Sequence, residues 1–158
     1  MPATLALRVA SGADAPAIVS LVNDAFAVER AFVDRDRTAL DEIQAMLGRG
    51  MFLVADAADG TLLACMYLER RGQRVYLGML SIQPTQQGRG LGRAMMAAAE
   101  AQCRAWGCEA IDIRILNLRS ELPPFYRKLA FVETGRTDIV EDFLSRVPYH
   151  FILMSKSV

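Results

Sequence analysis

Glycines at the end of an apolar strand pattern give this sequence its strongest chemical signal. Gly88, Gly90 and Gly92 follow Gln87 and lead directly into a helical pattern. Glycine allows backbone conformations in which successive N–H groups converge on one anion, and the positive end of a helix dipole strengthens such a site. The loop therefore predicts that a phosphate group binds at residues 87–93.

Two arginines in the same loop favour this interpretation. Arg89 and Arg93 lie at the start of the helix, where each cation opposes the helix dipole and costs roughly 0.3 kcal/mol or more unless an anion compensates it. The alternative is a glycine-rich turn with solvated arginines. Two familiar phosphate loops do not fit, because G-x-G-x-x-G would need glycine at Arg93 and the P-loop needs a G-K-[S/T] ending.

The first half of the chain predicts two helices and four strands. Ser11 with Asp14, and Thr38 with Asp41, match the capping box that begins a helix. Pairs of turn-forming residues with glycine separate three apolar runs that are typical of antiparallel strands. In order, we expect a strand at 5–10, a helix through 26, a mobile crossover at 27–37, a helix ending at 48, and strands at 51–57, 61–70 and 74–82.

The second half predicts the helix after the glycine loop and three further strands. Apolar side chains recur at helical spacing over residues 91–105, and Gly107 closes that helix. Residues 110–116 alternate apolar and charged side chains, which is typical of a strand with one solvated or functional face. A short helix over Pro123 and Pro124 to Leu129 and closing strands at 131–134 and 149–155 complete an α/β (α+β) chain with a mixed sheet covered by helices.

Composition excludes several classes of protein. The 158 residues fit a single domain over 1–158, and 18 Lys and Arg balance 18 Asp and Glu, which disfavours nucleic acid as a partner. No apolar run reaches the length of a membrane span and no secretory leader is evident, so we expect a cytoplasmic protein without membrane attachment. The spacing of Cys65, Cys103 and Cys108 fits neither a zinc site nor a redox pair, and each is expected to be a buried apolar residue.

The segment Gln87 to Gly92 matches Q-x-x-G-x-G and resembles the acyl-CoA loop of the GNAT superfamily of N-acyltransferases. The order of elements agrees over nearly the whole chain. Asn117, Tyr126 and Phe131 resemble the family's N…Y-x-x-x-G-F ending, although Ala130 replaces the glycine. The resemblance implies a mixed, mostly antiparallel central sheet of about six to seven strands with about four flanking helices.

The resemblance also implies a co-substrate and its binding residues. Acetyl-CoA is expected as acyl donor, with its pantetheine arm held by the backbone of residues 80–82 and its diphosphate by the glycine loop, and no metal is needed. Gly78 would allow close approach of the ligand or mark a bulge. The implied binding residues are Leu80, Ser81, Ile82, Gln87, Gly88, Arg89, Gly90, Leu91, Gly92, Arg93, Asn117 and Tyr126.

Within this family likeness, Tyr126 is the candidate proton donor. A phenol has an ordinary pKa near ~10, so it stays protonated at neutral pH and can protonate a departing thiolate whose acid has a pKa near ~8.5. The alternative is a core tyrosine beside Phe125. For the general base, Asp112 and Glu69 are the leading candidates, with Glu121 and His150 as alternatives. An ion pair between Asp112 and Arg114 would instead make that carboxylate structural.

We therefore expect an N-acetyltransferase that moves an acetyl group to a primary amine of a small molecule or peptide by direct attack in a ternary complex. The alternative function is a non-catalytic acyl-CoA-binding regulatory module. Residues 27–37 and 138–148 are expected to flank the amine site. A homodimer is one option for the oligomeric state, because closing strands in such folds can exchange between subunits. Acidic residues of these segments are candidates to attract a cationic amine, namely Glu29, Asp34, Asp138, Glu141 and Asp142.

Overall fold

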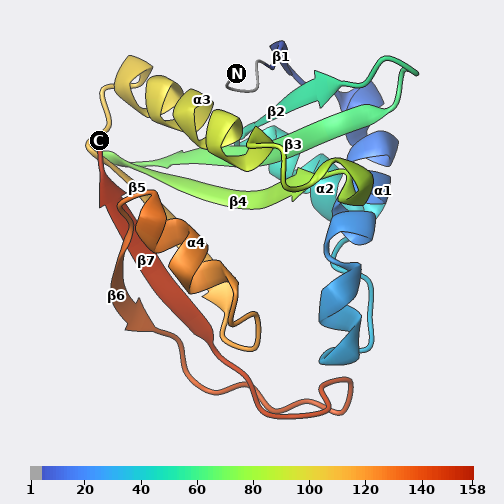
Figure 1. Cartoon of the computed structure of the whole chain (residues 1–158), viewed down its shortest axis with the longest axis vertical. Helices are drawn as coiled ribbons and strands as arrows, with labels where there is room; N and C mark the ends of the chain where they lie inside the picture. The colour runs from blue at the N-terminus through green and yellow to red at the C-terminus, as the bar shows by residue number, and fades with distance from the viewer. Residues whose placement is uncertain (1–4) are drawn as a thin grey trace.

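A single twisted sheet runs through the computed structural model, which describes residues 5–158 (Figure 1). Its seven strands have the order β1-β2-β3-β4-β5-β7-β6, and every neighbouring pair is antiparallel except β4 with β5. The strands are β1 (Leu7–Val9), β2 (Met51–Asp56), β3 (Leu62–Arg71), β4 (Arg74–Ile82), β5 (Ala110–Leu116), β6 (Val132–Arg136) and β7 (Phe151–Ser157). The mixed, mostly antiparallel sheet confirms the expected fold class.

Four α-helices flank the sheet in the described residues. They are α1 (Ala15–Ala25), α2 (Leu40–Arg49), α3 (Leu91–Ala105) and α4 (Leu122–Lys128), and short 3-10 turns precede α1, follow it at η2 (Ala27–Ala31) and follow β4 at η3 (Pro84–Gln86). The bounds of α3 and β5 are those expected from the sequence. The closing strands lie one to two residues later than expected, and Ala130, with a positive φ of 72°, completes the turn between α4 and β6.

Two apolar cores place the helices on opposite faces of the sheet. Helices α1 and α2 pack with Phe52 and Tyr67 on one face, through buried residues such as Ile18 and Ile43. Helix α3 packs on the other face against β5, and α4 contributes Tyr126 to the same core. All three cysteines are buried and unpaired, which confirms their expected apolar role.

The start of α2 differs from the sequence prediction. Thr38 was expected to cap the helix together with Asp41, but its hydroxyl donates a hydrogen bond of 2.8 Å to Glu42, one residue further on. The helix begins at Leu40 with Ala39 as its N-cap, and the backbone N–H of Thr38 is held by the Asn23 side chain of α1 at 3.0 Å. Tertiary contact with α1 therefore sets this helix start. At α1 the expected Ser11–Asp14 box is present.

The parallel pair β4–β5 is short, and this opens the sheet. The two strands pair only at Arg74, Val75 and Tyr76 with Ala110, Ile111 and Asp112. Beyond this point they diverge, so that the sheet forms a V in Figure 1 whose arms are β4 and the β5–β7–β6 group. In the described residues, no helix is long and apolar enough to cross a bilayer.

Candidate active site

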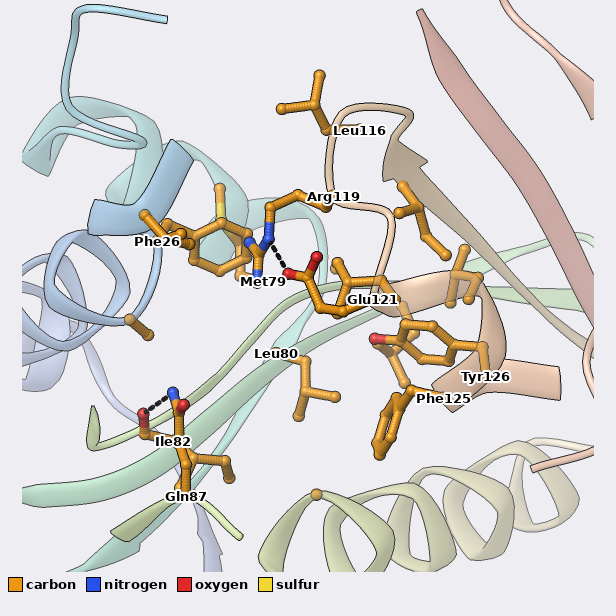
Figure 2. A pocket seen from close by; sticks show the side chains of 18 of the residues that line it. Phe26, Met79, Leu80, Ile82, Gln87, Leu116, Arg119, Glu121, Phe125 and Tyr126 are labelled. Atoms are coloured by element: carbon orange, nitrogen blue, oxygen red, sulfur yellow. Dashed lines mark hydrogen bonds and ion pairs between the residues drawn. The ribbon is translucent and has the colours of Figure 1, made fainter. Parts of the chain in front are cut away.

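A cavity of about 1080 Å³ fills the V between the diverging strands. Its walls come from β4, the glycine loop and the start of α3 on one side, and from β5, the following loop and α4 on the other (Figure 2). Residues at the end of α1 and in η2 close it from the second face of the sheet. The cavity therefore connects the side that carries α3 with the side that carries α1.

Strand β4 borders the cavity with an unpaired edge. Its register with β3 shifts so that Met79 and Leu80 stand opposite Met66 alone, and Met79 takes a positive φ of 55°. This is a β-bulge, which bends a strand and interrupts its ladder. Since β4 pairs with β5 only through Tyr76, the cavity-side edge of the bulged segment is free to bind an extended ligand through its backbone.

The Gly78 position shows how tightly this bulge is packed. A Cβ atom there would lie 2.9 Å from the Tyr76 hydroxyl oxygen, so only glycine fits without movement of that ring. The packing of the Tyr76 ring beside the bulge thus explains why position 78 is a glycine. Close approach of a ligand is therefore not required to explain it.

The glycine loop presents backbone N–H groups to the other end of the cavity. Gly88 and Gly90 have φ values of 82° and 78°, which non-glycine residues rarely adopt, and a Cβ atom at either would meet open space. Helix α3 begins at Leu91 without a side-chain cap and without an acidic residue in its first turn. Gln87 steadies the loop through a 3.3 Å hydrogen bond from its amide nitrogen to the Ile82 carbonyl oxygen (Figure 2). This arrangement suits a phosphate.

Most of the expected co-substrate residues border this cavity. Those that line it are Leu80, Ile82, Gln87, Gly88, Gly90, Leu91, Gly92, Arg93 and Tyr126. Three others lie elsewhere. Ser81 is buried and donates to the Met79 carbonyl oxygen at 3.1 Å, Asn117 exchanges hydrogen bonds of 2.9 and 3.0 Å with the His150 backbone, and Arg89 is exposed outside the lining.

Tyr126 lies on α4 with its ring in the α3-side core. Edge-on contacts to Phe125 and Phe131, with ring centroids 5.1 and 5.5 Å away, fix the ring. In Figure 2 its hydroxyl oxygen points into the cavity. Burial raises the pKa of Tyr126 to about 12, although the nearby Arg119 charge acts in the opposite direction. The phenol is therefore protonated at every pH at which such a protein works, and it can donate a proton.

Asp112 and Glu69 are both held by arginines away from the cavity lining. Asp112 accepts two hydrogen bonds from Arg74, at 2.6 and 2.8 Å, and another from Ser155. The expected structural ion pair of Asp112 thus exists, but its partner is Arg74 and not Arg114. Hydrogen bonds from Arg74 lower the pKa of Asp112, and hydrogen bonds from Tyr67 and an arginine lower that of Glu69. Their role as the base stays a prediction.

A partly buried ion cluster occupies the opposite wall of the cavity. Arg119 donates from Nη1 to Glu29 at 2.7 Å and from Nε to Glu121 at 2.6 Å. The side chains of Arg119 and Glu29 are only 14% and 18% exposed. Burial alone would raise the pKa of Glu121, but the hydrogen bond from Arg119 lowers it. Sequence reasoning named Glu29 and Glu121 as isolated candidates and missed Arg119, which no local pattern marks.

The second segment expected to flank the amine site lies elsewhere. None of residues 138–148 lines the cavity. Instead this connection packs on the crossover after α1, where Asp34 N–H donates to the Leu144 carbonyl oxygen at 2.9 Å and Arg146 N–H donates to that of Phe32 at 2.9 Å. The crossover therefore has a backbone partner along part of its length. The expectation that residues 138–148 border the cavity was wrong.

Comparison with known proteins identifies the type of domain. The family model described as "Acetyltransferase (GNAT) family" matches residues 16–131. A mycothiol acetyltransferase from Clavibacter michiganensis subsp. michiganensis (strain NCPPB 382) is 30% identical over 133 residues, which are 83% of this chain. The chain spans 44% of the length of that relative.

Solved structures share the whole fold at low sequence identity. The ribosomal-protein-S18-alanine N-acetyltransferase from Escherichia coli has a TM-score of 0.81 at 16% identity, over 98% of this chain and 94% of that one. A GNAT superfamily phosphinothricin acetyltransferase from Sinorhizobium meliloti, in complex with AcCoA, has a TM-score of 0.77 at 18% identity, over 99% and 89%. At these identities the likeness concerns the fold.

Proposed function

Because this chain belongs to the acetyltransferase (GNAT) family, we propose that it transfers an acetyl group from acetyl-CoA to a primary amine. The observation that carries this proposal is the cavity between β4 and β5. It joins an unpaired strand edge, a glycine loop at a helix start and a protonated phenol in one space. Each of these features meets a separate requirement of acetyl transfer from a thioester.

The co-substrate would lie on the α3 side of the V. The backbone N–H groups at residues 88–93 and the Arg93 side chain would hold the diphosphate, and Lys128 adds a second cation to this lining. The bulged edge of β4 at residues 79–82 would pair with the amide groups of the pantetheine arm. A backbone N–H of this edge would then polarise the thioester carbonyl.

The acceptor amine would enter from the α1 side and attack the thioester directly in a ternary complex. Its nitrogen forms a bond to the carbonyl carbon, the carbon–sulfur bond breaks, and the thiolate takes a proton from the Tyr126 hydroxyl. An acceptor that binds as an ammonium must lose two protons: the first leaves before the attack, and the second, lost as the amide forms, restores the Tyr126 hydroxyl. Glu121 lines this wall, and we assign it the ammonium, with a water molecule carrying its first proton to the solvent.

Glu121 suits this role by position rather than by basicity. Its carboxylate lies on the cavity wall with Arg119 on one side and Tyr126 on the other (Figure 2). The hydrogen bond from Arg119 keeps it ionised at neutral pH, so it attracts a cationic amine but binds a proton weakly. We therefore assign removal of the ammonium proton to a water molecule near Glu121, because Glu121 itself would not hold that proton.

A non-catalytic acyl-CoA-binding module is the competing function. It would keep the glycine loop and bind acetyl-CoA, but it would release no CoA when an amine is added. Calorimetric titration with CoA followed by a thiol-release assay over amino acids, amino-acid amides, polyamines and peptide N-termini separates the two. We expect both binding and amine-dependent thiol release. Absence of CoA binding would remove both functions, and binding without turnover would favour the regulatory module.

A further inference from the structure

We propose that the acceptor carries a carboxylate beside its amine and that Arg114 binds this carboxylate. The inference rests on the proposed acetyl transfer and specifies its acceptor as an amino-acid-like molecule. It starts from a cation on the cavity wall for which the protein supplies no anion. The position, the orientation and the surroundings of Arg114 each support it.

The position of Arg114 places it on the acceptor side of the cavity. In β5 the buried residues Ile113 and Ile115 face α3 in one core, so the alternating residue Arg114 faces the opposite side of the sheet. It nevertheless lines the cavity. The glycine loop and Arg93 belong to the α3 side, so Arg114 is not placed to neutralise the co-substrate's diphosphate.

The guanidinium of Arg114 is held in place by an aromatic ring. Its Cζ atom lies 3.8 Å from the centre of the Phe151 ring, and Phe151 is itself braced by Tyr149 at 5.9 Å. Such stacking fixes the plane of the guanidinium and leaves its N–H groups free at the edge. An arginine fixed in this way loses little conformational entropy when it binds a carboxylate with two parallel hydrogen bonds.

Protein carboxylates near Arg114 are already engaged. Asp112, its neighbour on the same strand face, is bound by Arg74 and Ser155. Within residues 5–158, no ion pair or hydrogen bond joins the Arg114 side chain to a protein acceptor. By contrast, the other two arginines that line this side of the cavity have carboxylate partners: Arg37 is paired with Glu42 at 3.8 Å, and Arg119 donates to two carboxylates. The cation available to an external anion is therefore Arg114.

The charge of the Glu29–Arg119–Glu121 cluster completes the argument. Glu29 and Glu121 share the single guanidinium of Arg119, so this cluster keeps one excess negative charge. An ammonium would be attracted to it, while a carboxylate would be attracted to Arg114. A molecule that carries both groups can bind both the acidic cluster and Arg114, whereas a simple polyamine would leave Arg114 without a partner.

Matched acceptor pairs test the inference. The measurement is kcat/KM from thiol release with common L-amino acids and with their carboxamides, which lack the anionic group, and it is expressed per unprotonated amine because the amine of the amide is less basic. Variants Arg114→Gln and Arg114→Lys are compared with wild type, and Arg104→Gln, an exposed arginine of α3 outside the cavity lining, is the matched control. Thermal unfolding and CoA titration of each variant verify that fold and co-substrate binding are intact.

We expect wild type to prefer the acid over its amide by roughly tenfold or more in kcat/KM, mainly through KM, as for a charged hydrogen-bonded pair. Arg114→Gln should abolish this preference by lowering kcat/KM for the acids far more than for the amides. Arg114→Lys should keep part of it, and Arg104→Gln should match wild type. An acid preference that survives Arg114→Gln would overturn the assignment to Arg114.

Two other results would have distinct meanings. If amides are acetylated as well as acids by wild type, the carboxylate inference fails and the acetyltransferase function stands. A preference for 2-aminoethyl phosphate over ethanolamine, without one for amino acids, would replace the carboxylate with a phosphate and also overturn the inference. If CoA binds but no amine of any kind releases thiol, the proposed function itself fails.

Discussion

At the scale of single residues, burial determines what Tyr126 can do. The ring is packed between Phe125 and Phe131, and its side chain is almost removed from water. Burial disfavours the phenolate and raises the pKa of Tyr126 to about 12. The hydroxyl is therefore protonated at rest under working conditions, as the proposed role of proton donor requires, and its position in the cavity is what the proposal adds.

Substitution Tyr126→Phe should lower kcat by ~10-fold or more, because it removes the proton donor and keeps the ring packing. The KM for acetyl-CoA should stay nearly unchanged. Tyr149→Phe is the matched control, since its hydroxyl accepts a 3.3 Å hydrogen bond from Arg35 outside the cavity lining. Steady-state kinetics with the best acceptor checks this, and an unaltered kcat in Tyr126→Phe would remove the residue from the mechanism.

At the scale of elements, β1 is fastened to the start of α1 by a shared arginine. Arg8 donates to Asp14 at 2.9 Å and to Asp56 of β2 at 2.8 Å. Hydrogen bonds from Arg8 lower the pKa of Asp14 from 3.8 to about 2. A carboxyl whose folded pKa is depressed stabilises the fold above its unfolded pKa, and this contribution disappears as the pH falls through the folded value.

Substitution Asp14→Asn should therefore destabilise the protein at neutral pH but not at low pH. The difference in unfolding free energy between wild type and variant should be constant above about pH 5 and should shrink between about pH 4 and pH 2. Urea unfolding at several pH values measures it. Asp138→Asn, at an exposed position, is the control and should leave the unfolding free energy nearly unchanged. A pH-independent difference for Asp14→Asn would contradict the assignment.

The glycine loop is the second element with a testable conformation. Gly90→Ala forces a non-glycine residue to a φ of 78° and places a methyl group in the cavity, where a Cβ atom meets no protein atom. Gly60→Ala imposes the same backbone strain at a φ of 86° in the β2–β3 turn. Both variants should destabilise the fold by about 1 kcal/mol. Only Gly90→Ala should weaken CoA binding, by about fivefold or more, because its methyl group would hinder the approach of a phosphate to the loop.

Calorimetric titration with CoA distinguishes these two variants. Equal CoA affinity in Gly90→Ala and wild type would show that the diphosphate does not approach this part of the loop. Equal losses of affinity in Gly90→Ala and Gly60→Ala would attribute the effect to general destabilisation rather than to the site.

Across the whole molecule, an ion pair joins the loop after β5 to η2, which follows α1. Arg119 follows β5 and reaches Glu29 of η2, 90 residues earlier in the chain, on the α1 side. Both side chains are largely buried, so loss of one partner leaves the other charge poorly solvated. We expect this pair to fix the width of the cavity.

Arg119→Met and Glu29→Gln should each lower the unfolding free energy by about 1–3 kcal/mol, and the double variant should lose less than their sum. A double-mutant cycle by urea unfolding measures this coupling. Arg30→Gln breaks a 3.5 Å pair with Asp36 in which both side chains are more than half exposed, at 56% and 61%, and should change stability by less than about 0.5 kcal/mol. Strictly additive losses of unfolding free energy would show that Arg119 and Glu29 are not energetically coupled.

Features that depend on local pattern could be predicted from the amino-acid sequence. Helix α3 and strand β5 have the expected bounds because apolar periodicity, Gly107 and strict alternation act over a few residues. The glycine loop was identified in the same way, whereas Tyr126 became a candidate through the family resemblance, and both border one cavity.

Only the tertiary structure decided which distant side chains meet. Asp112 pairs with Arg74, 38 residues away, rather than with Arg114 two residues along, because β4 and β5 are neighbours in the sheet. The same strand pairing ends after Tyr76, which opens the cavity and leaves Arg114 on its wall. Contacts of this kind depend on strand order and on the point where a ladder stops, and neither is encoded in the spacing of nearby residues.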